Sequence, residues 1–286
     1  MNRARAQGIP NFHIFGEVAA DGVVVAQLAR HTRLDKLPTV LDFGFANAVQ
    51  EVLARDGGTS VLAGLYQEDA LYEGAPDITP RLPTFTGNHD FGRLAWIIRN
   101  ARKDIGDEEL LLRLKLSNAM LFLLRGVPVV YYGDEQGFVG HGIDQAARQD
   151  MFPSQVASYN DQPLVGTGAT TAVANFDRQH PLYSQIAQLA QLRREHPGLR
   201  NGRQVVRAQS KTPGLFAASR IGADGREILV AFNTSTQALV AQVEVEPGTR
   251  SFKTLHGPCS DKVSAPGSVQ VKLLPLSYVA CVGAPR

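Results

Sequence analysis

Residues 82 to 93 read Leu-Pro-Thr-Phe-Thr-Gly-Asn-His-Asp-Phe-Gly-Arg, an apolar run that ends abruptly in three polar side chains. An apolar run bounded by a proline and a glycine is typical of a buried strand. The polar side chains, Asn88, His89 and Asp90, follow at its C-terminal tip, where β/α enzymes carry their catalytic residues. The stretch therefore predicts a parallel strand with reactive groups at its end.

The chain up to about residue 200 alternates short apolar runs with helix-like segments, which predicts βα units around a parallel sheet. The expected strands are Phe12 to Val18, Thr39 to Phe45, Leu82 to Asn88 and Val127 to Gly133. One clear helix is expected between Asp107 as its cap and Arg125 in its last turn, and another from Pro181 to about Glu195. A polar, aperiodic connection from Phe138 to Asp177 follows the fourth strand, and connections of that length are usually functional or mobile.

After residue 200 the pattern changes to short, valine-rich strands separated by turn residues. The expected strands are Gln204 to Gln209, Leu215 to Ser219, Glu227 to Asn233, Leu239 to Val245, Val269 to Leu274 and Tyr278 to Val282. Asp224-Gly225 between two of them is a strong hairpin signal. We therefore expect two domains, an α/β domain over residues 1–199 and a small antiparallel β-sandwich over residues 200–286.

The bulk composition argues against two classes of partner. The 286 residues carry a formal charge of +2 and scattered basic side chains, so nucleic acid is not an expected partner. The most apolar stretch, Leu110 to Leu124, is interrupted by Arg113 and Lys115. It falls short of the roughly 20 apolar residues of a membrane span, so no membrane partner is expected either.

The two cysteines, Cys259 and Cys281, both lie near the end of the chain. They fit either two small buried thiols or a disulfide in a secreted or periplasmic protein. Only the disulfide alternative favours export of the parent protein. Neither cysteine lies in a metal-ligand spacing, so no zinc site is expected.

Glu17 also follows an apolar run, so it is a second acid at the end of a predicted strand. Because parallel strands end at the same rim, Glu17 and Asp90 are expected on one face. Two converging carboxylates suit general acid/base chemistry, and glycoside cleavage characteristically needs such a pair. Each acid taken alone also fits a cap or a salt-bridge partner. The later acids Asp134 and Glu135 equally fit a capping or loop-fixing role.

Three segments together closely resemble the α-amylase family of α-glucan glycoside hydrolases. They are Ile14-Phe15-Gly16-Glu17-Val18, Phe85-Thr86-Gly87-Asn88-His89-Asp90, and the run from Gly126 to Gly137 with its Tyr-Tyr-Gly-Asp-Glu-Gln-Gly ending. Their order and separations also fit, and the resemblance covers essentially the whole chain. It implies a (β/α)8 barrel followed by an antiparallel domain, acting on α-1,4-linked glucans or maltooligosaccharides by a retaining mechanism.

The resemblance also implies roles for the residues that match its motifs. Glu17 is then the general acid/base, and Asp90 is the carboxylate that grips sugar hydroxyls and favours the oxocarbenium-like state. His89 hydrogen-bonds the same sugar ring, and Asn88 beside it counts as substrate-binding. No cofactor or metal is expected here, although calcium is a candidate for the complete protein. Hydrolase and transglycosylase activities stay open, because loops set them.

The family's nucleophile is an aspartate in a Gly-Phe-Arg-x-Asp-like segment on the strand before Glu17, and only eleven residues, none of them acidic, precede Phe12. The four expected strands match the fifth to eighth of the barrel, so we expect half a barrel with two open edges. Such a fragment is expected to be inactive alone and to associate with a missing N-terminal half or with itself. The alternatives are one half of a split enzyme and a non-catalytic glucan-binding or interaction module.

Overall fold

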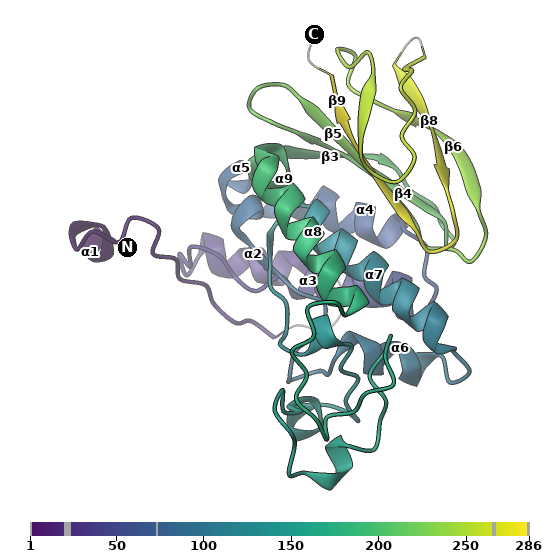
Figure 1. Cartoon of the computed structure of the whole chain (residues 1–286). Helices are drawn as coiled ribbons and strands as arrows, with labels where there is room; N and C mark the ends of the chain where they lie inside the picture. The colour runs from purple at the N-terminus through teal and green to yellow at the C-terminus, as the bar shows by residue number, and fades with distance from the viewer. Residues whose placement is uncertain (1, 20–23, 73, 265–266, 285–286) are drawn as a thin grey trace.

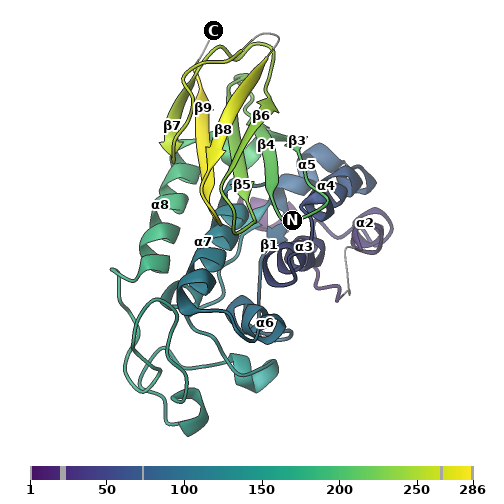
Figure 2. The same cartoon turned by 90° about the vertical axis from the view of Figure 1, so that its right-hand side faces the viewer.

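The computed structural model describes residues 2–19, 24–72, 74–264 and 267–284. Helices form the middle of the molecule, antiparallel strands lie at one end, and an irregular segment that precedes α8 lies at the other (Figure 1). A view turned by 90° shows the same order, with α7 and α8 reaching from the strands towards the irregular segment (Figure 2). None of the helices in the described part of the chain is long and apolar enough to cross a membrane.

Most of the first two hundred residues are helical or irregular. The α-helices are α1 (Asn2–Ala6), α2 (Val25–Arg33), α3 (Phe43–Ala54), α4 (Ser60–Gln67), α5 (Ala75–Ile78), α6 (Leu94–Ala101), α7 (Asp107–Leu123), α8 (Pro181–Glu195) and α9 (Pro197–Asn201). The 3₁₀ turns are η1 (Glu68–Leu71), η2 (Thr79–Arg81), η3 (Asp134–Gln136), η4 (Asp144–Ala147) and η5 (Ala157–Tyr159). The predicted helix from Pro181 to Glu195 is confirmed, and the connection before it contains only short 3₁₀ turns.

The helix predicted from Asp107 is confirmed, but both of its end assignments are wrong. Gly106 is the N-cap, so Asp107 lies inside the first turn, where its charge still favours the helix dipole. The helix ends at Leu123, before Arg125. Arg125 is buried and bonds to two aspartates instead of to the last carbonyls of the helix.

The four predicted strand segments pair side by side, in chain order and in parallel. Gly16 bridges Val40, Asp42 bridges Thr84, and β1 (Pro83–Thr84) pairs with β2 (Val127–Pro128). The regular strands are much shorter than predicted, because pairing is confined to these few residues. The polar tips that follow the segments therefore emerge on one rim.

Two of these segments depart from the predicted strands. The Thr39 to Phe45 segment stops at Asp42, whose carboxylate accepts a hydrogen bond from the Phe45 amide and caps α3. The segment predicted as Phe12 to Val18 is extended but not buried, since Phe12 and Phe15 are about half exposed. In the described part of the chain, no strand pairs with its outer side.

The C-terminal strands form two antiparallel sheets. Their bounds are β3 (Arg203–Ala208), β4 (Leu215–Ile221), β5 (Glu227–Asn233), β6 (Leu239–Glu244), β7 (Phe252–His256), β8 (Ser268–Leu273) and β9 (Tyr278–Gly283). The larger sheet has the order β3-β4-β5-β9-β7, and β6 pairs with β8. Six of the seven strands match predictions within two residues, and the predicted hairpin joins β4 to β5. The strand β7 was missed, because its sequence alternates weakly.

The larger sheet faces two cores. One face packs with the helices through side chains such as Phe216, Phe232 and Tyr278. Other side chains of β4, β5 and β9 cluster with Val243 and Val271 from the β6–β8 pair. The change of secondary structure near residue 200 therefore does not interrupt the apolar core that begins among the helices.

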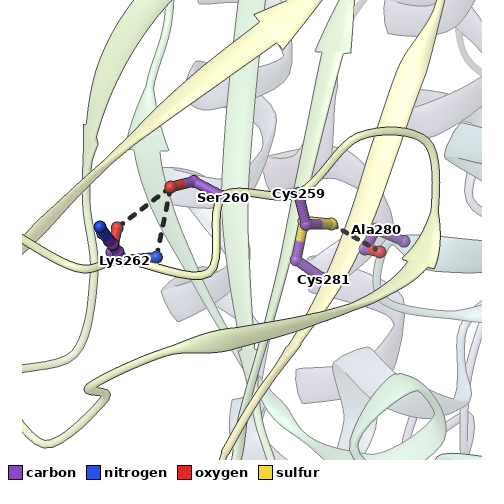
Figure 3. Close-up of a disulfide and its surroundings, with 5 residues drawn as sticks. All are labelled: Cys259, Ser260, Lys262, Ala280 and Cys281. Carbon is purple, nitrogen blue, oxygen red and sulfur yellow. Dashed lines mark hydrogen bonds between the residues drawn. A yellow bond between two sulfur atoms is a disulfide. The ribbon is translucent and has the colours of Figure 1, made fainter.

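The two cysteines are joined in a disulfide between the loop after β7 and strand β9 (Figure 3). Their Cα atoms lie 5.9 Å apart, and the Cys259 sulfur lies 3.3 Å from the carbonyl oxygen of Ala280. Of the two alternatives that the sequence left open, the structure has the disulfide.

Candidate active site

The loop from Asn88 to Gly92 is tight and internally bonded. The backbones of Asn88 and Gly92 exchange two hydrogen bonds, of 3.1 and 3.0 Å. The Asn88 side-chain oxygen accepts from the amides of Asp90 and Phe91, at 2.9 and 3.1 Å. Gly92 closes the loop with φ +96°, a conformation that favours glycine. Asn88 therefore shapes the loop with its side-chain oxygen, and its predicted substrate contact stays a prediction.

His89 and Asp90 present polar groups at the tip of this loop. The His89 Nε2 atom lies 3.2 Å from Asp90 Oδ1, and the two side chains are 39% and 52% exposed. The His89 carbonyl accepts a hydrogen bond from the Asp144 amide in the irregular segment. The loop is thus fixed at its backbone, while both side chains remain open to a ligand.

Glu17 and Asp90 line the same cavity of about 1000 Å³, although 72 residues lie between them in the chain. The wall also contains Phe91, Trp96 and Asn47, whereas neither Asn88 nor His89 belongs to it in the described residues. Glu17 is exposed and directly follows the Gly16 bridge. The structure therefore brings the two predicted catalytic carboxylates to one open space with aromatic and amide groups beside them.

Glu51 is a third acid on the cavity wall, and no sequence pattern predicted it there. It lies on α3, where its carboxylate accepts a hydrogen bond of 3.4 Å from Arg55 four residues later. Such i,i+4 pairs are common on helix surfaces.

Arg93 holds the Asp90 loop in place, and no sequence pattern predicted this role. It is fully buried, and its guanidinium donates to Gln149 at 2.9 Å and to Asp134 and the Tyr132 carbonyl at 2.7 Å each. It also lies 4.4 Å from the centre of the Tyr131 ring. Arg93 therefore ties the Asp90 loop to the segment after β2. In the sequence, only its position directly after the Asn-His-Asp-Phe-Gly run could have suggested that Arg93 supports the loop.

The acids of the Gly133-Asp134-Glu135 segment fix the local backbone. Burial raises the pKa of Asp134 to about 6, although Arg93 opposes that rise. The Glu135 carboxylate accepts a hydrogen bond of 2.8 Å from the Gly133 amide. The loop-fixing alternative for these two acids is thus the one that the contacts support.

A second ion-pair network lies below the strands. Arg125 donates to Asp69 through two nitrogens, at 2.7 and 2.5 Å, and also to the fully buried Asp42. Burial raises the pKa of Asp69, although Arg125 opposes that rise. The Arg125 amide donates to Gln204 in β3 at 2.8 Å. This network joins the parallel segments to the C-terminal sheet.

Nowhere in the described ranges do three His, Cys, Asp or Glu side chains converge to hold a metal ion.

Comparison with known proteins points to the same family as the sequence motifs. Residues 1–202 match the family model for the α-amylase catalytic domain. The chain is 39% identical over 256 residues to an α-amylase of Streptomyces lividans, covering 89% of this chain. It is 32% identical over 199 residues to a cyclomaltodextrin glucanotransferase of Paenibacillus macerans.

Solved structures show the same fold at lower identity. An Anoxybacillus α-amylase aligns with a TM-score of 0.74 at 22% identity over 99% of this chain, and an α-amylase from Geobacillus thermoleovorans, solved with acarbose, aligns at 0.73 and 18% over 97%. The chain covers 54% of each of these structures and 28% of the Streptomyces lividans protein. It therefore spans only part of the relatives that it matches.

Proposed function

The chain belongs to the α-amylase family, and from this premise we propose that it is the C-terminal portion of a retaining glycoside hydrolase of α-1,4-linked glucans. The observation that carries the proposal is the shared cavity of Glu17 and Asp90. Glycoside cleavage needs one carboxyl group that donates a proton and a second that stays ionised. Glu17 and Asp90 reach one open space from separate strand tips, so a proton donor and an ionised group that contacts the sugar lie on the same cavity wall, and the nucleophile is a further carboxylate.

Each side chain has a distinct role in the proposed mechanism. Glu17 protonates the glycosidic oxygen of the leaving group and later activates water. Asp90 accepts hydrogen bonds from sugar hydroxyls, which strengthen as the ring flattens towards the oxocarbenium-like state. His89, beside Asp90 and exposed, donates a further hydrogen bond to the same ring. Phe91 and Trp96 on the cavity wall supply the apolar surface on which a sugar ring can pack.

The nucleophile of the proposed reaction comes from outside these 286 residues. A retaining enzyme places a second carboxylate about 5 Å from the acid/base, on the opposite face of the sugar. Glu51 is the third acid of the cavity wall, but it lies on a helix and is bonded to Arg55. The chain alone is therefore proposed to be inactive, and the complete active site to need an N-terminal half.

The open sheet supports this division of the proposed barrel. The four parallel segments correspond to half of a (β/α)8 barrel, and the two C-terminal sheets to a β-sandwich. Apolar side chains are exposed at both outer segments, with Phe12 and Phe15 on one and Val127 and Val129 on the other. The chain also covers only 54% of the solved α-amylase from Anoxybacillus. Four further βα units would cover both edges.

Reconstitution tests the catalytic proposal. The chain alone is expected to release no maltose from maltoheptaose, and co-expression with the N-terminal half of a matching α-amylase is expected to restore turnover. Glu17→Gln should then abolish that turnover, while Glu51→Gln should leave most of it. Turnover by the chain alone, or undiminished turnover in the reconstituted Glu17→Gln protein, would contradict the proposal.

A glucan-binding role without catalysis is the second candidate function. It can be tested directly because a tryptophan lies in the cavity wall. The chain has one tryptophan, Trp96, and it lines the cavity with Glu17 and Asp90. Its fluorescence should therefore change when maltoheptaose binds to the isolated chain, and Asp90→Asn should weaken that response. A response in the isolated chain without any turnover after reconstitution would favour the binding module over the split enzyme.

A further inference from the structure

The irregular segment between β2 and α8 lies at the end of the molecule opposite the C-terminal strands (Figures 1 and 2). Two exposed phenylalanines of this segment lie together. Phe152 is 67% and Phe176 is 56% exposed, and their ring centres are 5.2 Å apart at an angle of 58°. Single exposed apolar side chains are ordinary on soluble proteins, but adjoining large ones mark binding surfaces.

Hydrogen bonds hold the two rings in place. The Asn175 amide donates to the Met151 carbonyl at 2.8 Å, directly beside the two phenylalanines. The Asn175 side chain is buried and donates to the carbonyls of Thr170 and Val173, at 3.2 and 2.7 Å. The rings are therefore presented by a fixed backbone, so a ligand would not have to order them.

Two buried glutamines connect this aromatic pair to the rim of the candidate active site. Gln149, three residues before Phe152, accepts the hydrogen bond from Arg93 below the Asp90 loop. Gln136 exchanges two hydrogen bonds of 3.0 Å with the backbone of Asp177, the residue after Phe176. Each phenylalanine therefore lies within three residues, in sequence, of a side chain or backbone group that is hydrogen-bonded to a segment following one of the parallel strands.

We propose that Phe152 and Phe176 form a second α-glucan contact, on the same rim as the Glu17–Asp90 cavity. The choice of ligand class rests on the proposed function. Pyranose rings have apolar C–H faces that pack on aromatic rings and release water from both surfaces. A long glucan chain held at two places gains affinity through effective concentration, so the contact favours polymeric substrates over short ones.

The small area of the aromatic pair favours a sugar over a protein partner. Its exposed neighbours in sequence are mixed, with polar side chains such as Asp150 and Arg178 beside Val156 and Val173, which are 43% and 53% exposed. A stable protein interface buries about 800 Å² on each partner, much more than two rings provide. One or two sugar rings match the aromatic surface better.

Native electrophoresis of the 286-residue chain in gels containing amylopectin tests the contact. The chain is expected to be retarded, and Phe152→Ser with Phe176→Ser should weaken its apparent affinity at least tenfold. Phe152→Tyr with Phe176→Tyr should retain most of the affinity, because tyrosine keeps the ring. Leu274→Ala removes another exposed apolar side chain, 72% exposed and located between β8 and β9, and should change nothing. Circular dichroism checks that each variant is folded.

The fluorescence of Trp96 separates this contact from the cavity. Loss of retardation in the serine variant, with an unchanged Trp96 response to maltoheptaose, is the expected result. Retardation without a Trp96 response would support the aromatic contact and contradict glucan binding at the cavity. Retardation that survives the serine changes, or no retardation of the unmodified chain, would overturn the aromatic contact. A defect confined to assembly with the N-terminal half would assign the pair to a protein interface and overturn it too.

Discussion

Arg93 and Asp134 meet at 2.7 Å beneath the exposed loop that carries His89 and Asp90. One partner follows that loop in the chain, and the other begins the 3₁₀ turn after β2. Because Arg93 is fully buried, this ion pair and its neighbouring hydrogen bonds fix the spacing between two strand tips. The geometry of the candidate site therefore depends on residues that would not touch a substrate.

Replacing Arg93 is expected to destabilise the chain strongly. Arg93→Ala leaves Asp134 and Gln149 without their shared donor, and breaking one side of a buried pair costs about 3 kcal/mol or more. Urea unfolding followed by circular dichroism measures the change. The control is Arg99→Ala, whose pair with Asp107 is 27% and 61% exposed and should contribute less than about 1 kcal/mol. Equal losses in the two variants would show that the buried pair has no special role.

The pH dependence of stability should report on Asp134. Its folded-state pKa lies near 6, above the ordinary value of 3.8, so the folded chain holds this proton more tightly than the unfolded chain. The stabilisation is then complete below about pH 4 and is lost as the pH rises through about 6. We expect a loss of about 1 to 2 kcal/mol, since 23% of the side chain remains exposed.

Asp134→Asn provides the matching control, because asparagine does not titrate and can still accept from Arg93. The difference in unfolding free energy between Asp134→Asn and the unmodified chain should change between pH 4.5 and 7.5, in favour of the variant at the higher pH. Parallel stability curves across this range would show that Asp134 titrates as an ordinary exposed acid.

Local patterns in the sequence were enough to predict the order of the parallel segments, the helix from Pro181 to Glu195 and most of the C-terminal strands. Apolar periodicity and turn residues are properties of neighbouring residues, so they can be read without the fold. The expectation that Glu17 and Asp90 emerge on one face also came from one general rule about strand ends.

The roles of the two buried arginines and the lengths of the strands depend on long-range contacts, which local sequence patterns do not contain. Arg125 looked like the end of a helix, but its partners Asp42 and Asp69 come from distant parts of the chain. Arg93 had no local pattern, because its partners Asp134 and Gln149 lie 41 and 56 residues away. The length of each regular strand depends on how many of its residues pair with an adjacent strand. Here only a few residues pair, so the strands are shorter than predicted.

Asp42 is expected to have two separable roles. Its carboxylate caps α3 through the Phe45 amide at 2.9 Å and also pairs with Arg125. Asp42→Asn keeps a good cap and loses the charge, whereas Asp42→Ala loses both, so alanine should cost about 1 kcal/mol more. Both variants should lose several kcal/mol, because Arg125 is buried. Urea unfolding resolves the difference, and equal values for the two variants would rule out a contribution from the cap.

The disulfide is expected to stabilise the C-terminal sheets. It closes a loop of 22 residues, which corresponds to about 3 kcal/mol in the chain-entropy description. The variant Cys259→Ala with Cys281→Ala should lose about that amount in urea unfolding. Reduction of the unmodified chain should lower its stability similarly and leave the variant unchanged. If the reducing agent destabilised both proteins equally, its effect would not come from breaking the disulfide.

A pair of glycine substitutions with opposite expected signs tests the shape of the Asp90 loop. Gly92 has φ +96°, and a Cβ there would lie 2.8 Å from the Trp96 ring and 3.0 Å from the Gly142 carbonyl oxygen. Gly92→Ala should therefore destabilise the chain by about 2 kcal/mol and shift the fluorescence of Trp96. Gly64 lies inside α4, and apart from its own helix backbone no heavy atom lies within 4 Å of the position that a Cβ would take. Gly64→Ala should therefore stabilise the chain by about 0.5 to 1 kcal/mol.

Urea unfolding and emission spectra of the two glycine variants give both readouts. The opposite signs matter because a general effect of adding a methyl group would move both variants in the same direction. A neutral Gly92→Ala with unchanged emission would mean that the loop adopts another backbone conformation in solution, and that Asp90 is not held where the cavity needs it.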